Sequence, residues 1–600
     1  MKKFLGHSFH IPVLGVGYSV DTPLKVAKYG ISSVISLVDD GLMENLRKKI
    51  SENYNEIYIP INTKEPDSRS KRITAYLNLL NTCVKKQFEE LRNSSFEKDG
   101  GIKKYLDMLP DYSELKKKYK EMLAQTDLNL KKSLEKWIRE NLQPGSIDVN
   151  IMTKVDKENT DSDGHTLPTE FNDAHAALRG FAMSELESSI IFSAGMSPRL
   201  YGYTEVFKDF LPNSLGEFKK KIVIKVSDFR SALIQGKYLA KKGLWVSEFR
   251  IESGLNCGGH AFATDGYLLG PILEEFKTKR NELLNSLKEI LHPALKKKDI
   301  DVDLEKLNIK VTVQGGVGKV TEQNFLLRHY DVDSVGWGSP FLLVPETTNV
   351  DEYTLKLLAD AGEDDLYLSN ISPLGVPFNS VRRNSKDLEK LKRIEDGKPG
   401  SPCPKKFLTF RNKLSETPIC TASLAYIKKV IGLNDNPETS SEFQKEYDNT
   451  LDKVCLCEGL TASAIITNEL ENSKQSLAVS VCPGPNLAYF SKIASLSEMV
   501  DHIYGRINLI TNENRPNMFI KELDLYINYL RGKLSEKVND VSKQTEEYFQ
   551  TFKKNISEEI EYYKGLIPNL TEETEKVREK IKRDLEDLEQ KFYNLFAPNV

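Results

Sequence analysis

The feature that most constrains this chain is a regular alternation of strand-like and helical runs between residues 11 and 362. The strand-like runs cover 11–17, 32–37, 147–154, 189–193, 221–226, 244–250, 309–313 and 333–338. Alternating strands and helices favour a parallel sheet with helical crossovers. Eight such units close most simply into a barrel, with the functional residues at the C-terminal ends of the strands. We therefore predict an α/β fold, a (β/α)8 TIM barrel over residues 1–362.

Three further regions extend beyond the regular barrel pattern. Residues 62–145 interrupt the alternation with apolar positions at helical spacing, which predicts a helical insertion acting as a lid or subdomain. Residues 363–510 hold five of the seven cysteines. Residues 511–600 are rich in Glu, Lys, Leu and Tyr at helical spacing, and we predict a C-terminal helical hairpin packed on the body or on a partner. Oligomer formation through these last helices is one expectation.

Charge and hydropathy narrow the range of partners. The net charge of −3 offers no global attraction to nucleic acid or to an anionic membrane surface. No apolar run approaches the ~18 residues of a membrane span. The N-terminus carries two lysines without a long apolar region or a cleavage site, and seven cysteines without an export signal indicate reduced thiols. We expect a cytoplasmic protein with a small-molecule substrate and neither nucleic-acid nor membrane partners.

Glycine clusters follow the later strands. Gly258 and Gly259 come directly after the sixth strand and are followed by His260. A glycine pair lets a planar or anionic group approach the backbone, and histidine is the usual proton carrier near neutral pH. The alternative is a tight turn with a surface histidine.

A second pair of clusters lies at the ends of strands seven and eight. Gly315, Gly316 and Gly318 open a helix directly after the seventh strand, and Gly338 and Ser339 follow the eighth. Free N–H groups at a helix N-terminus favour phosphate, and barrels that bind phosphorylated ligands use these two loops. Two ordinary glycine turns are the competing interpretation.

Taken in order, these motifs resemble a known family. Gly254 with Gly-Gly-His at 258–260, Val-Gln-Gly-Gly-Val-Gly at 313–318 and Val-Asp-Ser-Val-Gly-Trp-Gly-Ser-Pro-Phe at 332–341 resemble the nitronate monooxygenase (2-nitropropane dioxygenase) family of FMN-binding TIM barrels. The runs 11–17 and 148–150 fit the family's first and third strands. That family is similar in turn to flavin-dependent enoyl-ACP reductases.

The resemblance implies a bound FMN and assigns residues to it. Its phosphate would lie on Gly315, Gly316, Gly318, Gly338 and Ser339, and His260 would be the catalytic acid/base. The remaining cofactor contacts implied by the resemblance are Gly15, Asn150, Lys225, Gly258 and Gly259.

This chain also departs from the family pattern. Asn256 and Cys257 stand where the family has an acidic and a small residue, and Glu252 stands near the position of a flavin-facing glutamine. We therefore expect a rebuilt substrate pocket.

Lys225 alternates with Val223 along the fifth strand, which places it toward the barrel interior. A charge there needs a partner, either a reduced flavin or a carboxylate of Glu252 or Glu248.

The function predicted from these residues is that of an FMN-dependent oxidoreductase resembling nitronate monooxygenases, with His260 beside the flavin. One alternative is a flavin-dependent reductase of an activated double bond that uses NAD(P)H. A second is a noncatalytic flavin- or phosphate-binding assembly module.

The cysteines form a separate constellation. Thiolates bind iron–sulfur clusters or zinc, yet the usual Cys-x-x-Cys spacing is absent here. The hypotheses are an iron–sulfur cluster serving an electron-transfer partner, a zinc site, or unligated buried thiols. The five candidate ligands are Cys403, Cys420, Cys455, Cys457 and Cys482. Cys257, at the expected barrel mouth, is either a redox-active thiol or an apolar filler.

Overall fold

The computed structural model describes residues 5–97, 100–161, 163–193, 195–412, 414–432, 441–471, 475–536 and 543–597. Part of the N-terminus that we used to judge export, residues 1–4, lies outside these ranges. No helix of the described ranges combines the length and hydrophobicity of a membrane span.

Eight parallel strands form one sheet in the order β1-β8-β7-β6-β5-β4-β3-β2, and a parallel bridge between Ile11 and Ser33 joins its two edges. The strands are β1 (Phe9–His10), β2 (Ser33–Ser36), β3 (Ile147–Met152), β4 (Ser188–Ser193), β5 (Lys220–Val226), β6 (Val246–Glu252), β7 (Lys310–Gln314) and β8 (Ser334–Gly336). The (β/α)8 barrel predicted from the sequence is confirmed.

The first strand lies earlier than predicted. It covers Phe9–His10, and the run 11–17 is instead the loop that follows it. Pro12 cannot donate to a ladder of main-chain hydrogen bonds, and Gly15 has a φ of 53°, which ends an extended conformation.

Helices follow the strands and cover the outside of the barrel. They are α1 (Thr22–Val26), α2 (Asp40–Tyr54), α7 (Asp173–Ala182), α8 (Pro198–Thr204), α9 (Phe229–Lys241), α10 (Leu269–Lys296), α11 (Val320–His329) and α12 (Glu352–Asp360). Several of these helices begin with a side chain that caps their N-terminus. At the beginning of α9, for example, the Asp228 carboxylate accepts a hydrogen bond from the N–H of Ser231.

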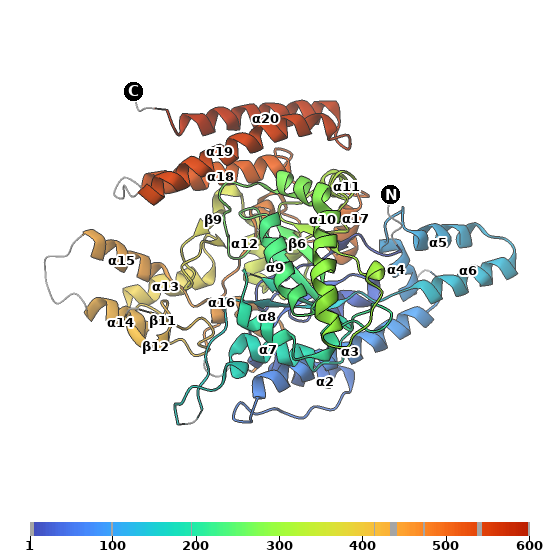
Figure 1. Cartoon of the computed structure of the whole chain (residues 1–600), viewed down its shortest axis with the longest axis horizontal. Helices are drawn as coiled ribbons and strands as arrows, with labels where there is room; N and C mark the ends of the chain where they lie inside the picture. The colour runs from blue at the N-terminus through green and yellow to red at the C-terminus, as the bar shows by residue number, and fades with distance from the viewer. Residues whose placement is uncertain are drawn as a thin grey trace.

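The segment between β2 and β3 is helical, as predicted. It contains α3 (Ser68–Asn93), α4 (Gly101–Met108), α5 (Glu114–Ala124) and α6 (Leu128–Asn141). The first half of α3 packs into the main hydrophobic core, whereas α4, α5 and α6 enclose a small core of their own and project from one side of the barrel in Figure 1.

The chain after α12 returns to the barrel. It forms β9 (Leu366–Ser369), β10 (Phe378–Val381), α13 (Ser385–Glu395), β11 (Phe410–Asn412), β12 (Ser415–Ile419), α14 (Leu424–Gly432), α15 (Ser441–Asp452), α16 (Leu456–Thr467) and α17 (Leu496–Ile503). α16 is buried along nearly its whole length, and Gly17 in the loop after β1 donates its N–H to Leu460 O at 2.9 Å. This second region therefore packs directly on the barrel.

Three helices, rather than the predicted hairpin, end the described chain: α18 (Met518–Glu536), α19 (Lys543–Leu566) and α20 (Glu575–Asn594). They lie together along one side of the molecule (Figure 1). Glu522 of α18 anchors them, because its carboxylate accepts from Ser253 Oγ at 2.5 Å and from Leu269 N at 2.8 Å. One continuous hydrophobic core includes residues from Phe9 to Phe592.

Candidate functional site

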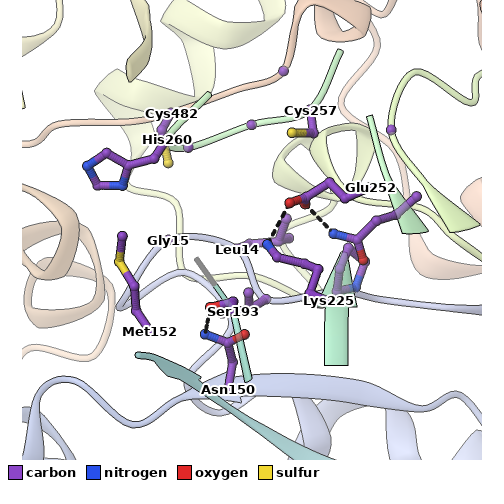
Figure 2. A pocket seen from close by; sticks show the side chains of 18 of the residues that line it. Leu14, Gly15, Asn150, Met152, Ser193, Lys225, Glu252, Cys257, His260 and Cys482 are labelled. Atoms are coloured by element: carbon purple, nitrogen blue, oxygen red, sulfur yellow. Dashed lines mark hydrogen bonds and ion pairs between the residues drawn. The ribbon is translucent and has the colours of Figure 1, made fainter. Parts of the chain in front are cut away.

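A cavity of about 420 Å³ opens at the C-terminal ends of the strands. This is the end at which barrels of this class carry their chemistry, and the volume is that of a cofactor or small-ligand site. Of the candidate residues, those lining the cavity are Gly15, Asn150, Lys225, Gly258, Gly259, His260, Gly315, Gly316, Gly338, Ser339, Cys457 and Cys482. Figure 2 shows His260 and Met152 on one side and Lys225 with Glu252 on the other.

Lys225 is held by a carboxylate. Val223 packs inside the barrel, and Lys225, two residues further along β5, faces the cavity above it. Its Nζ lies 2.7 Å from Glu252 Oε2, which decides between the carboxylate partners that the sequence left open. Glu248 is engaged instead by Arg250, at 2.8 Å.

Glu252 is also bound by Gln314, whose Nε2 donates to Glu252 Oε1 at 2.5 Å. The other amide atom, Gln314 Oε1, is buried without a hydrogen-bond partner among the described residues. Asn150 Nδ2 donates to Ser193 Oγ at 3.2 Å on the neighbouring strands. Gln314 was not singled out from the sequence, although its position at a strand end directly before Gly315 was a usable signal.

His260 is half-buried at the edge of the cavity. Its Nε2 lies 2.7 Å from Ser372 Oγ, and its ring packs edge-on against Phe378 with centroids 4.9 Å apart. Burial lowers the pKa of His260 to about 4, and the charge of Lys225 acts in the same direction. The imidazole is therefore neutral at pH 7 and able to accept a proton.

The two glycines before His260 have different surroundings. A Cβ on Gly258 would meet Cys482 O at 2.5 Å, so this glycine permits close packing of the chain. Gly259 has a φ of 79°, and a Cβ there would meet nothing within 4 Å. Its N–H donates to Cys482 O at 3.2 Å.

The loops after β7 and β8 present main-chain N–H groups at the cavity. Those of Gly316, Val317, Gly338 and Ser339 have no protein acceptor within the described part of the chain. Ser339 Oγ accepts from Gly484 N at 2.7 Å. These four groups belong to the predicted phosphate site, and Gly315 of the same loop also lines the cavity.

Gly318 is a correction to that prediction. Its N–H donates to Glu322 Oε2 at 2.9 Å, and its carbonyl accepts from His502 Nε2 at 3.0 Å. Glu322 thereby occupies the position that an external anion would take at the start of α11. The phosphate site is limited to residues before Gly318 and to the loop after β8.

The second half of the chain supplies much of the cavity wall. Cys482, Gly484 and Asn486 form a strap between the loops after β6 and β8, and α16 contributes Leu456, Cys457 and Leu460. Phe407 and Leu408 complete this side. The sequence did not reveal these contributions, because they depend on tertiary packing of segments that carry no local motif.

The five candidate cysteine ligands do not gather around one ion. Cys482 lies at the strap, with its carbonyl bound by Gly259, and all seven cysteines lie within the described residues. No three of their thiols approach within 4.8 Å of one another. A tetrahedral ion with ~2.3 Å bonds to sulfur needs closer thiols, so the single five-cysteine site was wrong.

Cys257 is a half-buried residue of the cavity wall. Its Sγ donates to Ser253 O at 3.1 Å, and burial, together with the charge of Glu252, raises its pKa well above the usual value. A high pKa disfavours the thiolate, which argues against a redox-active thiol at this position.

No family model matches this chain, and no curated protein matches it. Twelve chains of solved structures are similar to it, among them the following two. The enoyl reductase domain of MlnA from the macrolactin biosynthesis cluster of Bacillus amyloliquefaciens is 12% identical, with a TM-score of 0.32, over 64% of this chain and 86% of that one. Nitroalkane oxidase from Streptomyces ansochromogenes is 12% identical, with a TM-score of 0.28, over 63% and 85%. Neither likeness shows what this chain does.

Proposed function

We propose that this chain is an FMN-dependent oxidoreductase in which His260 moves the substrate proton. The observation that carries the proposal is one cavity faced by a neutral histidine, a paired lysine and four uncommitted N–H groups at the β7 and β8 ends. Bound FMN would supply the hydride or electron acceptor.

The residues present fit this cofactor. A cavity of about 420 Å³ falls in the usual range for ligand sites. The N–H groups of Gly316, Val317, Gly338 and Ser339 would hold the phosphate. Buried acceptors without partners, Gln314 Oε1 and Asn256 Oδ1, also line the cavity and suit donors of a heterocyclic ring.

His260 and Lys225 would have separate roles in the reaction. His260 is neutral and accepts a proton from an acidic C–H of the substrate, while Ser372 orients its ring through Nε2. Glu252 balances the charge of Lys225 and so allows the lysine to remain at the cavity. The ammonium group of Lys225 would then stabilise negative charge that develops in the cavity during flavin reduction.

Anaerobic titration of the FMN-loaded protein tests this function. Addition of a nitronate, a nitroalkane or NAD(P)H should bleach the oxidised flavin absorbance, and oxygen should restore it. Bleaching by NAD(P)H alone would favour a reductase of activated double bonds. Colourless protein that binds no FMN on reconstitution would refute the proposal.

Ser339→Asp tests the location of the phosphate. The aspartate keeps an acceptor for Gly484 N but places a negative charge beside the proposed phosphate, so we expect the Kd for FMN to rise at least tenfold. Riboflavin has no phosphate, and its Kd should change far less. Flavin fluorescence quenching measures both. Ser339→Asn is the matched neutral control, and equal effects of Asp and Asn on FMN would contradict the assignment.

A further inference from the structure

A second cavity lies behind one wall of the first. It has a volume of about 360 Å³, within the usual range for small-ligand sites. It opens between β9 and α18, which lie near each other in Figure 1. The loop after β6 separates the two cavities, since Leu255 lines the second, whereas its neighbours Gly254 and Asn256 line the first. No residue lines both cavities, so the second is a separate site.

The walls of this second cavity are largely apolar. β9 contributes Leu366 and Leu368, and α18 contributes Leu525. Leu368 remains 40% exposed, so apolar surface is left for an occupant to cover. Tyr367 and Tyr529 add two aromatic rings. A flat apolar molecule that packs against these side chains removes their surface from water, which favours its binding.

A glycine keeps α18 open beside the cavity. Gly532 lies inside this helix and lines the cavity, and a Cβ there would meet nothing within 4 Å. Glycine is the least favourable residue after proline inside a helix. Close packing within the chain does not require it here, because no described atom occupies the position of a side chain. A longer side chain would take up space that is now open for a ligand.

Three carboxamides supply hydrogen-bonding groups to the cavity. Asn379 Nδ2 donates to Cys257 O at 2.7 Å, and Asn528 Nδ2 donates to Asp524 Oδ2 at 3.1 Å. Within the described part of the chain, Oδ1 of both side chains accepts no hydrogen bond, and the carboxamide of Asn370 makes none. Two available acceptors favour a ligand that carries N–H donors.

The charged side chains of the cavity are already engaged. Lys521 Nζ lies 2.6 Å from Glu363 Oε2. Lys533 Nζ lies 5.8 Å from the centre of the Tyr529 ring, within the range of a cation–π contact. A charged ligand would compete with these contacts, whereas a neutral ligand leaves them intact. The electrostatics therefore favour a neutral occupant.

We propose that the second cavity binds a neutral heterocycle with N–H donors, about the size of a nucleoside, and that this ligand regulates the first site. Binding rests on the open volume, on Gly532 and on the carboxamides, and it does not depend on FMN. The regulatory role rests on the proposed function.

Asn379 connects the two cavities. It lines the second cavity, and its main-chain N–H donates to Gly259 O at 2.9 Å while its carboxamide holds Cys257 O. Cys257 and Gly259 line the first cavity just before His260. A ligand that donates to Asn379 Oδ1 would restrain this carboxamide and, through it, the loop that carries His260. The occupant of the second cavity would then alter proton transfer at the first.

Equilibrium dialysis of the FMN-saturated full-length chain against labelled adenosine tests the binding. Adenosine is a neutral heterocycle with amino donors, and saturating FMN keeps it out of the first cavity. We expect a single adenosine per chain. Gly532→Leu fills the open space and should raise the Kd for adenosine by about tenfold or more. AMP carries a phosphate and should bind no more tightly than adenosine.

Gly565→Leu is the matched control. Gly565 lies inside α19 and not at the cavity, and a Cβ there also meets nothing within 4 Å. This variant should bind adenosine as the wild type does. Adenosine should change the rate of anaerobic flavin reduction roughly fivefold or more in the wild type and in Gly565→Leu, but not in Gly532→Leu.

The site is refuted if the wild type binds no adenosine, or if the wild type and Gly532→Leu bind it equally. AMP that binds about tenfold more tightly than adenosine would refute a neutral ligand. If Gly532→Leu does not fold, Leu368→Trp, at an exposed position of β9, fills the cavity instead and decides. Adenosine binding without a change in reduction rate would keep the site and refute the regulation. Adenosine binding by a chain that takes up no FMN would refute the proposed function but not the site, and FMN binding without adenosine would do the reverse.

Discussion

His260→Ala is expected to lower turnover by roughly 10²–10⁴-fold while FMN remains bound, because general acid–base catalysis contributes about that much. The imidazole sits at the cavity edge, and its contacts are Ser372 and Phe378 rather than the N–H groups proposed to hold the phosphate. Rapid-reaction measurement of flavin reduction, together with the flavin content of the purified variant, separates the two effects. Loss of FMN with an unchanged reduction rate in the loaded fraction would contradict an acid/base role.

Two further variants sharpen this test. Ser372→Ala should slow reduction less than His260→Ala, since it removes only the group that orients the ring. His165→Ala removes a solvent-exposed histidine from a loop and should leave the rate unchanged. If Ser372→Ala slowed reduction as much as His260→Ala, the result would assign the proton transfer to Ser372 rather than to His260 alone.

The lowered pKa of His260 gives the proposed mechanism a pH dependence. The base must be unprotonated, so the rate of flavin reduction should fall as the pH drops through about 4. The unfolded histidine has the higher pKa, 6.5, and therefore binds the proton first. The contribution of this buried neutral group to stability is full above pH 6.5 and is lost as the pH falls toward 4.

The barrel was predictable because its signals are local and repeated. Apolar runs such as 221–226 identify strands, and glycines after them identify strand ends. The first strand was misplaced because the apolar run 11–17 contains Pro12 and Gly15, which form a loop instead. The reading of Gly318 as part of an anion site overlooked Glu322, which stands three residues after the N-cap Lys319, the spacing of a capping box.

Other parts of the site depend on distant contacts. Lys225 could be placed on the interior face of β5, but its partner depended on the β5–β6 register, which shifts between Ile222 and Val223. The cavity walls formed by α16 and by the strap at Cys482 carry no recognisable motif. Their sequences resemble those of any apolar helix and any tight loop, so they do not indicate which segment lines the cavity.

Arg515→Met is expected to have the largest effect on stability. Arg515 is buried, and its guanidinium binds Glu322 through Nη1 at 2.7 Å and Nη2 at 2.9 Å. It also donates to Gly316 O at 2.7 Å and to Asn486 Oδ1 at 2.8 Å. One side chain from the segment before α18 thus joins the loop after β7, the start of α11 and the strap. Its removal leaves a buried carboxylate unpaired, which costs about 3–5 kcal/mol.

The same substitution should weaken FMN binding, because Gly316 lies in the loop proposed to hold the phosphate. Thermal unfolding and flavin fluorescence measure the two effects. Arg411→Met, which breaks an exposed pair with Glu158, is the control and should cost at most about 1 kcal/mol. Arg515→Met/Glu322→Met removes both charges and should recover part of the stability, because the cost of the single variant comes from the unpaired carboxylate. If Arg515→Met unfolds at the same temperature as the control, the Glu322 carboxylate is stable without Arg515. In that case the contacts of Arg515 with the loop after β7 and with the strap would contribute nothing to the free energy of unfolding.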